Sequence, residues 1–138
     1  MPNKYLQKKS KELEKLISDR GNKFFISCDL DDTLTCFTGW KGYEHIGNPR
    51  PDIVKFLRLA KKIKNAYIII YTCRVSDSSR HILSGSVEAV KKWLNRWSIP
   101  FDEIWTGRGK PFSNLYIDDL SANPNCKECM KRAEQCLR

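Results

Sequence analysis

Short apolar segments alternate with amphipathic ones along most of this chain, and this alternation constrains the fold more than any other feature. The apolar segments predict strands at residues 24–28, 67–71, 102–105 and 115–117. Helical periodicity predicts helices over Pro51–Lys64 and Ser86–Trp97. Apolar strands joined by helices are typical of a parallel sheet with helices on both faces. We therefore expect a three-layer, Rossmann-like α/β fold.

The 138 residues fit one domain with its own hydrophobic core. Residues 1–22 predict a basic amphipathic helix that precedes a domain of residues 23–138, and this helix offers a surface for oligomer formation. A C-terminal helix is predicted to open at Pro124, with Cys126, Cys129 and Cys136 on one side. A reduced helix that faces the core accounts for this pattern. A metal site or a disulfide is the alternative.

The longest uninterrupted apolar run is Ala66–Tyr71, which is far short of the roughly 20 residues needed to cross a bilayer. The first twenty residues mix Lys with Glu and have no apolar centre, so they do not resemble a signal peptide. We expect a soluble, cytoplasmic protein with no membrane partner. Its net charge of +9 predicts a surface that attracts phosphates, nucleic acid or other anionic polymers.

Chemically capable side chains follow each predicted strand: Asp29 and Asp31, then Thr72, then Lys110, then Asp118 and Asp119. Ligands of parallel sheets bind beyond the carboxyl ends of the strands, so we expect these side chains to meet in one crevice. Carboxylates that crowd together need a cation, and Mg²⁺ prefers oxygen ligands. Thr72 and Lys110 suit the oxygens of a phosphate group instead.

The order of these residues resembles the haloacid dehalogenase superfamily. Its first motif, D-x-D-x-T after a strand, is matched by Asp29-Leu30-Asp31-Asp32-Thr33. Thr72, Lys110 and the pair Asp118-Asp119 match the second, third and fourth motifs in the same order, and the resemblance covers residues 23–125. The segments 71–74 and 109–119 are similar to small bacterial and phage phosphatases of this superfamily, including phosphatases associated with capsular polysaccharide synthesis.

The resemblance implies a Mg²⁺-dependent phosphomonoester hydrolase that forms an aspartyl-phosphate. In that scheme Asp29 is the nucleophile, and Asp31 protonates the leaving oxygen and then activates water. Thr72 and Lys110 hold the phosphoryl oxygens. The implied Mg²⁺ ligands are Asp29, the backbone carbonyl of Asp31, Asp118 and, close by, Asp119. Arg74, two residues after Thr72, is a further candidate for binding a phosphate or acidic group.

The gaps between Asp29, Thr72 and Lys110 are too short for a cap domain, so we expect an open site. Residues 35–48 predict a flap whose aromatic residues either contact the substrate or pack the flap down. The expected substrate is a phosphorylated small molecule or a phosphorylated polymer end. Alternatives are a 3′-phosphatase of nucleic-acid ends and a basic nucleic-acid-binding or partner-binding protein on the same scaffold. A response-regulator receiver fits poorly, because its acidic pair comes first and its Lys last.

Overall fold

The computed structural model describes residues 11, 21–63, 65–75, 85–107, 109–119, 121 and 124–137. The predicted helix of residues 1–22 lies outside these ranges, apart from three residues. The described elements are β1 (Phe24–Asp29), η1 (Leu30–Leu34), α2 (Pro51–Lys61), β2 (Ala66–Tyr71), α3 (Ser86–Arg96), β3 (Glu103–Trp105), β4 (Leu115–Ile117) and α4 (Lys127–Cys136). Among the helices of these ranges, none has the length and apolar character that a membrane span requires.

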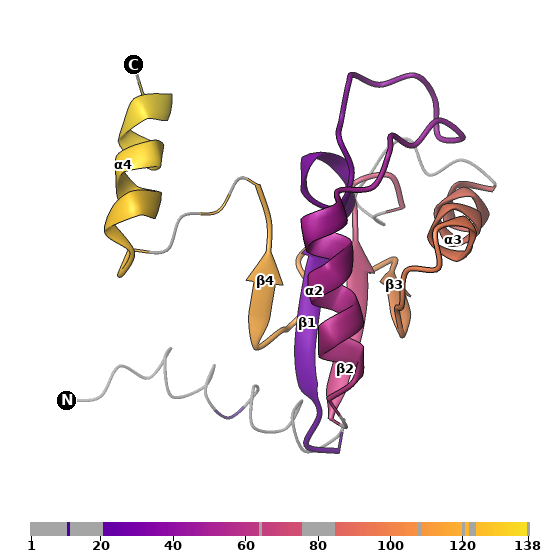
Figure 1. The fold of residues 1–138 in the computed structure, drawn as a ribbon, viewed down its shortest axis with the longest axis horizontal. Coiled ribbons are helices and arrows are strands. Elements are labelled where there is room, and N and C mark those ends of the chain that lie inside the picture. Colours follow the sequence, from indigo (N-terminus) through magenta and orange to yellow (C-terminus); the bar gives the residue numbers. More distant parts are fainter. Residues whose placement is uncertain are drawn as a thin grey trace.

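The four strands form one parallel sheet in the order β3-β2-β1-β4 (Figure 1). β1 pairs with β2 along its whole length, from Phe24 opposite Ala66 to Asp29 opposite Tyr71. On its other side, Cys28 of β1 lies opposite Ile117 of β4. The predicted parallel sheet is therefore confirmed, and all four strands end at the same edge.

One face of the sheet carries the main hydrophobic core. Alternation along β1 and β2 places Ile26, Cys28, Ile68 and Ile70 on this face, all of them buried. Both crossover helices pack against it, through Val54, Leu57 and Ala60 of α2 and Val90, Trp93 and Leu94 of α3. Full burial of one such large apolar side chain stabilises the fold by about 1.5–3 kcal/mol.

A loop, residues 111–113, covers the opposite face. The ring of Phe112 lies edge-on to that of Phe25 at 6.2 Å, and the hydroxyls of Ser27 and Ser113 are hydrogen-bonded. Helices were predicted on both faces of the sheet. Within the described ranges, helices pack against one face only. The connection from β3 to β4, residues 106–114, explains this difference, because a crossover with its own helix needs about a dozen residues.

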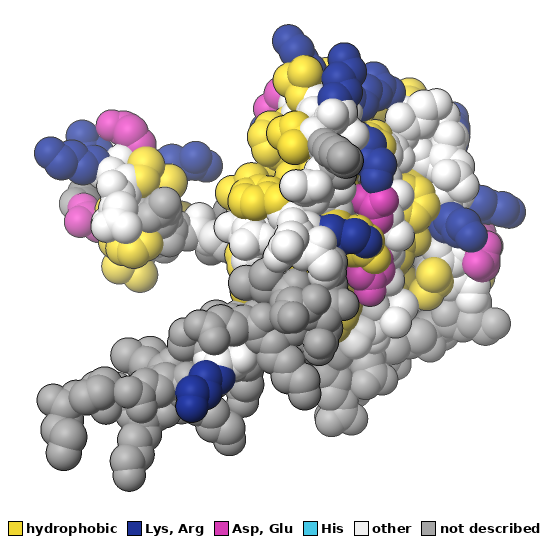
Figure 2. Space-filling view, turned by 90° about the horizontal axis from the view of Figure 1, so that it is seen from below, with side chains coloured by type: hydrophobic (Ala, Val, Ile, Leu, Met, Phe, Trp, Pro, Cys, Tyr) yellow, Lys and Arg dark blue, Asp and Glu magenta, His cyan; other side chains and the backbone are white. Residues whose placement is uncertain are grey.

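α4 stands apart from the sheet, at the left of Figure 1, and forms a separate lobe with projecting Lys and Arg side chains in Figure 2. None of its described residues is buried, so the prediction that it faces the core is wrong. It also begins at Lys127, after the N-cap Cys126, and not at Pro124. Five of its ten residues are charged, so it offers only a narrow apolar side, on which Met130 stays exposed. All six cysteines are free thiols.

Candidate active site

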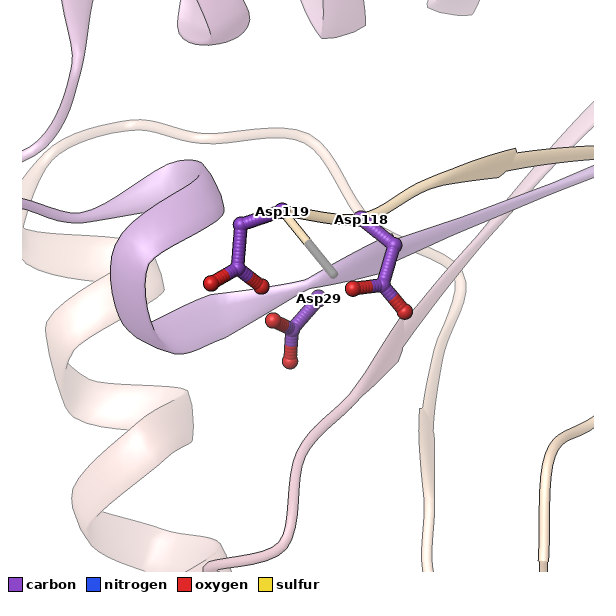
Figure 3. Close-up of side chains that lie close together, drawn as sticks. All are labelled: Asp29, Asp118 and Asp119. Carbon is purple, nitrogen blue, oxygen red and sulfur yellow. The ribbon is translucent and has the colours of Figure 1, made fainter. Parts of the chain in front are cut away.

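Three carboxylates gather at the carboxyl edge of the sheet, between β1 and β4 (Figure 3). Asp29 is the last residue of β1, and Asp118 and Asp119 directly follow β4. Each carboxylate offers an oxygen within 4.8 Å of the other two. Asp29 and Asp118 are half-buried and Asp119 is exposed. Three of the four residues predicted to bind metal therefore form one group, which we call the carboxylate triad.

Thr33 holds two members of the triad together from η1. Its buried hydroxyl lies 3.2 Å from Oδ2 of Asp29 and 3.4 Å from Oδ1 of Asp119, so its single proton serves one of them at a time. The same hydroxyl accepts the backbone N–H of Asp119 at 3.0 Å. The final Thr of the D-x-D-x-T motif thus has a clear local task, which is to fix the end of β4 against the end of β1.

The sharp turn of η1 explains why only part of the D-x-D-D-T segment faces the triad. The turn is closed by the N–H of Thr35, which donates to the carbonyl of Leu30 at 3.0 Å. Asp32 adopts a left-handed conformation, with φ of 62°, and its side chain is exposed. Asp residues tolerate this conformation better than most. Asp32 is accordingly not a member of the triad.

Lys110 and Tyr71 both contact Asp118. The Tyr71 hydroxyl donates to Oδ2 of Asp118 at 2.6 Å, and Nζ of Lys110 lies 3.3 Å from the same oxygen. The Lys110 ammonium also lies over the Tyr116 ring, 4.6 Å from its centre, a favourable cation–π arrangement. Tyr71 was not predicted as a site residue. Its position as the last residue of β2, directly opposite Asp29, is the signal that could have identified it.

The electrostatics of the triad favour a bound cation. Burial and the charges of Asp118 and Asp119 raise the pKa of Asp29 to about 7. Burial and the contact with Asp118 also raise the pKa of Tyr71, which keeps its hydroxyl protonated as a donor. A divalent cation between the carboxylates would favour their ionised forms, and oxygen donors of this kind suit Mg²⁺. The donor set therefore fits the predicted metal.

Thr72 and Arg74 follow β2 and are both buried. The Thr72 hydroxyl accepts the backbone N–H of Arg74 at 3.3 Å. The Arg74 side chain forms two parallel bonds with Asp31, Nε to Oδ2 at 2.8 Å and Nη2 to Oδ1 at 2.9 Å. Asp31 is thus paired with Arg74 and its carboxylate is not part of the triad. The role of Arg74 in phosphate binding stays a prediction, and its resident partner is Asp31.

The flap predicted at residues 35–48 is closed at its base. Thr35 and Pro49 form an antiparallel bridge, and the N–H of Cys36 donates to the carbonyl of Asn48 at 3.0 Å. Gly47 is required here, because a Cβ at this position would lie 2.2 Å from the carbonyl oxygen of Cys36. Trp93 of α3 donates its indole N–H to the Gly47 carbonyl at 2.9 Å. The base of the flap is therefore anchored to the domain.

A cleft of about 810 Å³ lies between the triad and α4. Thr33, Asp118 and Asp119 line one side. Cys129, Arg132, Ala133 and Cys136 of α4 line the other. Within the described ranges, the chain between Asp29 and Thr72 consists of η1, the flap, α2 and β2, without a separate cap domain. The described walls of the cleft thus come from η1, the start of α2, the end of β4 with the residues after it, and α4.

Comparisons with models of protein families, with curated proteins and with solved structures find no match to this chain.

Proposed function

We propose that this protein is a Mg²⁺-dependent phosphomonoester hydrolase of the haloacid dehalogenase type. The observation that carries the proposal is the carboxylate triad, with Lys110 in contact with one of its members, at the carboxyl edge of a parallel sheet. The D-x-D-x-T motif and the order of the later motif residues support the same proposal. A phosphoryl-transfer site needs oxygen ligands for a metal, a nucleophile and a positive group for the phosphate.

In this proposal the carboxylates of the triad hold Mg²⁺, and the backbone carbonyl of Asp31 is a further ligand. The ion, when bound, neutralises charge on the carboxylates and on the phosphoryl oxygens. Lys110 contributes a second positive charge from the side of Asp118. Thr72 contributes a hydroxyl group. Because this hydroxyl accepts the backbone N–H of Arg74, its own proton stays available for donation. Together these groups offset the negative charge that opposes attack by a carboxylate on a phosphate.

The reaction proceeds in two displacements. A carboxylate oxygen of Asp29 forms a bond to phosphorus while the bond from phosphorus to the leaving oxygen breaks. Asp31 donates a proton to that oxygen, which departs as an alcohol. Water then attacks the phosphorus of the aspartyl-phosphate and gives a proton to Asp31, while the bond from phosphorus to the Asp29 oxygen breaks. Inorganic phosphate is released, and both carboxyl groups return to their starting states.

A panel of phosphomonoesters assayed with Mg²⁺ tests the proposal. We expect phosphate release by the wild type and a loss of at least about 10³-fold in kcat for Asp29→Asn. Asp31→Asn is expected to lower kcat by about 10²–10⁴-fold for alkyl phosphates. Asp52→Asn is the matched control, because Asp52 is an exposed carboxylate on α2 that pairs with Arg50 at the surface. Unchanged turnover by Asp29→Asn would remove the nucleophile and with it the proposal.

The charge of the protein favours a second candidate, in which the substrate is the 3′-phosphate end of a nucleic acid. The net charge is +9, and Lys and Arg side chains are spread over the face shown in Figure 2. Contacts between such side chains and phosphates make binding weaken steeply with salt. Activity on a 3′-phosphorylated oligonucleotide that falls steeply with salt, beside salt-independent activity on a small phosphate ester, supports this candidate. Equal salt dependence for both substrates contradicts it.

A further inference from the structure

The Arg74 side chain has an acceptor for each of its five N–H groups. Nε and one N–H of Nη2 donate to the two oxygens of Asp31. The second N–H of Nη2 donates to the carbonyl of His45 at 3.2 Å. Nη1 donates to the carbonyls of Gly42 at 3.3 Å and Tyr43 at 3.4 Å. A guanidinium group has five donors in a planar fork, so this set of partners is complete.

The burial of Arg74 makes these contacts energetically important. The residue is only 6% exposed, and a guanidinium group stays charged in proteins. A buried charge without a partner is strongly unfavourable, so the paired Asp31 and the three carbonyls permit this burial. Two parallel bonds also fix the orientation of a carboxylate, which a single point charge such as an ammonium group does not.

Three of the five acceptors belong to the flap. Gly42 has φ of 99°, a conformation that side-chain-bearing residues rarely adopt, and its carbonyl accepts from Nη1. Trp40 of the flap lies against the guanidinium, 4.8 Å from the centre of the ring to Cζ. The flap therefore wraps around Arg74, in addition to being anchored at its base.

The backbone of Arg74 completes the arrangement. Its N–H donates to the Thr72 hydroxyl, while its side chain holds Asp31 and the flap. One residue thus contacts the predicted phosphate-binding hydroxyl, the predicted acid and the loop beside them. All of these contacts are intramolecular.

We propose that Arg74 is a positioning residue, which orients the carboxylate of Asp31 toward the leaving group and holds the flap in place. The part of this inference that concerns the acid rests on the proposed function. Arg74 does not bind the phosphate of the substrate, because its donors are already used. Loss of Arg74 therefore impairs proton donation to the leaving oxygen and leaves phosphate binding intact.

The dependence of kcat on the leaving group tests the first part. A p-nitrophenolate departs without a proton, whereas an alkoxide needs one, so a misplaced acid affects mainly alkyl phosphates. For Arg74→Lys we expect kcat to fall about tenfold or more on an alkyl phosphate and less than about threefold on p-nitrophenyl phosphate, with KM within about twofold. Arg58→Lys is the matched control, since Arg58 of α2 is exposed and donates to the carbonyl of Trp97.

Two results would overturn the assignment of Arg74 as the residue that orients the acid. The first is an equal fall in kcat on both substrates, and the second is a rise in KM of tenfold or more on both, which indicates a phosphate ligand. The double variant Arg74→Lys with Asp31→Asn supplies a further check. If Arg74 acts through Asp31, the double variant turns over the alkyl phosphate at the rate of Asp31→Asn alone. Additive losses contradict this.

Limited proteolysis tests the second part and does not depend on catalysis. Trypsin cleaves after the exposed Lys41 of the flap, and we expect Arg74→Gln to accelerate this cut about tenfold relative to Arg58→Gln under native conditions. Wild-type cleavage rates in a folded Arg74 variant would overturn the role in holding the flap. If Arg74→Gln does not fold, Arg74→Lys and the charge-free pair Arg74→Met with Asp31→Asn take its place. A wild type that cleaves no phosphomonoester refutes the proposed function and leaves this measurement valid.

Discussion

Replacing Asp29 with Asn is expected to stabilise the protein at pH 8 when Mg²⁺ is absent. The pKa of Asp29 in the folded protein is about 7, against an ordinary value of 3.8. As the pH rises above about 4, the unfolded chain loses this proton and the folded protein retains it. The free energy of unfolding therefore falls across this window, and the loss is complete above pH 7. Asn carries no charge at any of these pH values, so the free energy of unfolding of the variant does not fall in this way.

The size of the effect follows from the shift. A difference of about three pKa units corresponds to a ceiling of ~4 kcal/mol. Asp29 is half-buried, so water screens part of the interaction, and we expect a gain of about 1–2 kcal/mol for Asp29→Asn at pH 8. The amide oxygen of Asn can still accept from Thr33, which keeps the local hydrogen bond in place.

Urea denaturation of both proteins in EDTA, at pH 5 and pH 8, measures this gain. Addition of Mg²⁺ should then raise the unfolding midpoint of the wild type and leave that of Asp29→Asn nearly unchanged, because only the wild type keeps the full ligand set. Asp52→Asn controls for the general loss of a negative charge. If Asp29→Asn is no more stable than the wild type at pH 8, or if Asp52→Asn gains as much, the electrostatic account of the triad is refuted.

Three further predictions concern the surroundings of the site. Thr33→Val leaves the N–H of Asp119 without its acceptor, and we expect a loss of about 1–3 kcal/mol in urea denaturation and weaker Mg²⁺ binding in calorimetry. Gly47→Ala forces a contact with the backbone of Cys36, so thermal unfolding should show a destabilisation of about 1–3 kcal/mol; an unchanged Tm argues against this close approach. Burial raises the pKa of Cys28 to about 12, so this thiol should resist alkylation at pH 8 until the protein unfolds, as mass spectrometry can follow.

The strands and their common edge were predictable from the sequence, because apolar runs such as Ala66–Tyr71 bury both faces of a parallel strand. Asp29 and Asp118 meet because each comes at or just after the end of its strand, and because β1 and β4 are neighbours in the sheet. The contact between Tyr71 and Asp118 was not predictable. It depends on strand order and register, which residue patterns alone leave open.

Arg74 and α4 show two other limits of sequence reasoning. The charge of Arg74 indicates that it attracts an anion, but only the path of the chain makes Asp31 the nearest one. The helical periodicity of α4 correctly predicts a less polar side. It does not tell whether that side packs into a core or lines a cleft, and here Cys129, Ala133 and Cys136 line the cleft beside the triad.

The strand order has a consequence for how the protein is made. Among the strands of the described ranges, β4 is the last to be synthesised, yet it lies beside β1, which is the first. Two of the three triad carboxylates follow β4, so a nascent chain that has not reached residue 119 carries Asp29 without its full complement of neighbours. The full set of three carboxylates at this edge therefore exists only after residue 119 has been synthesised, and a chain that stops before that residue lacks it.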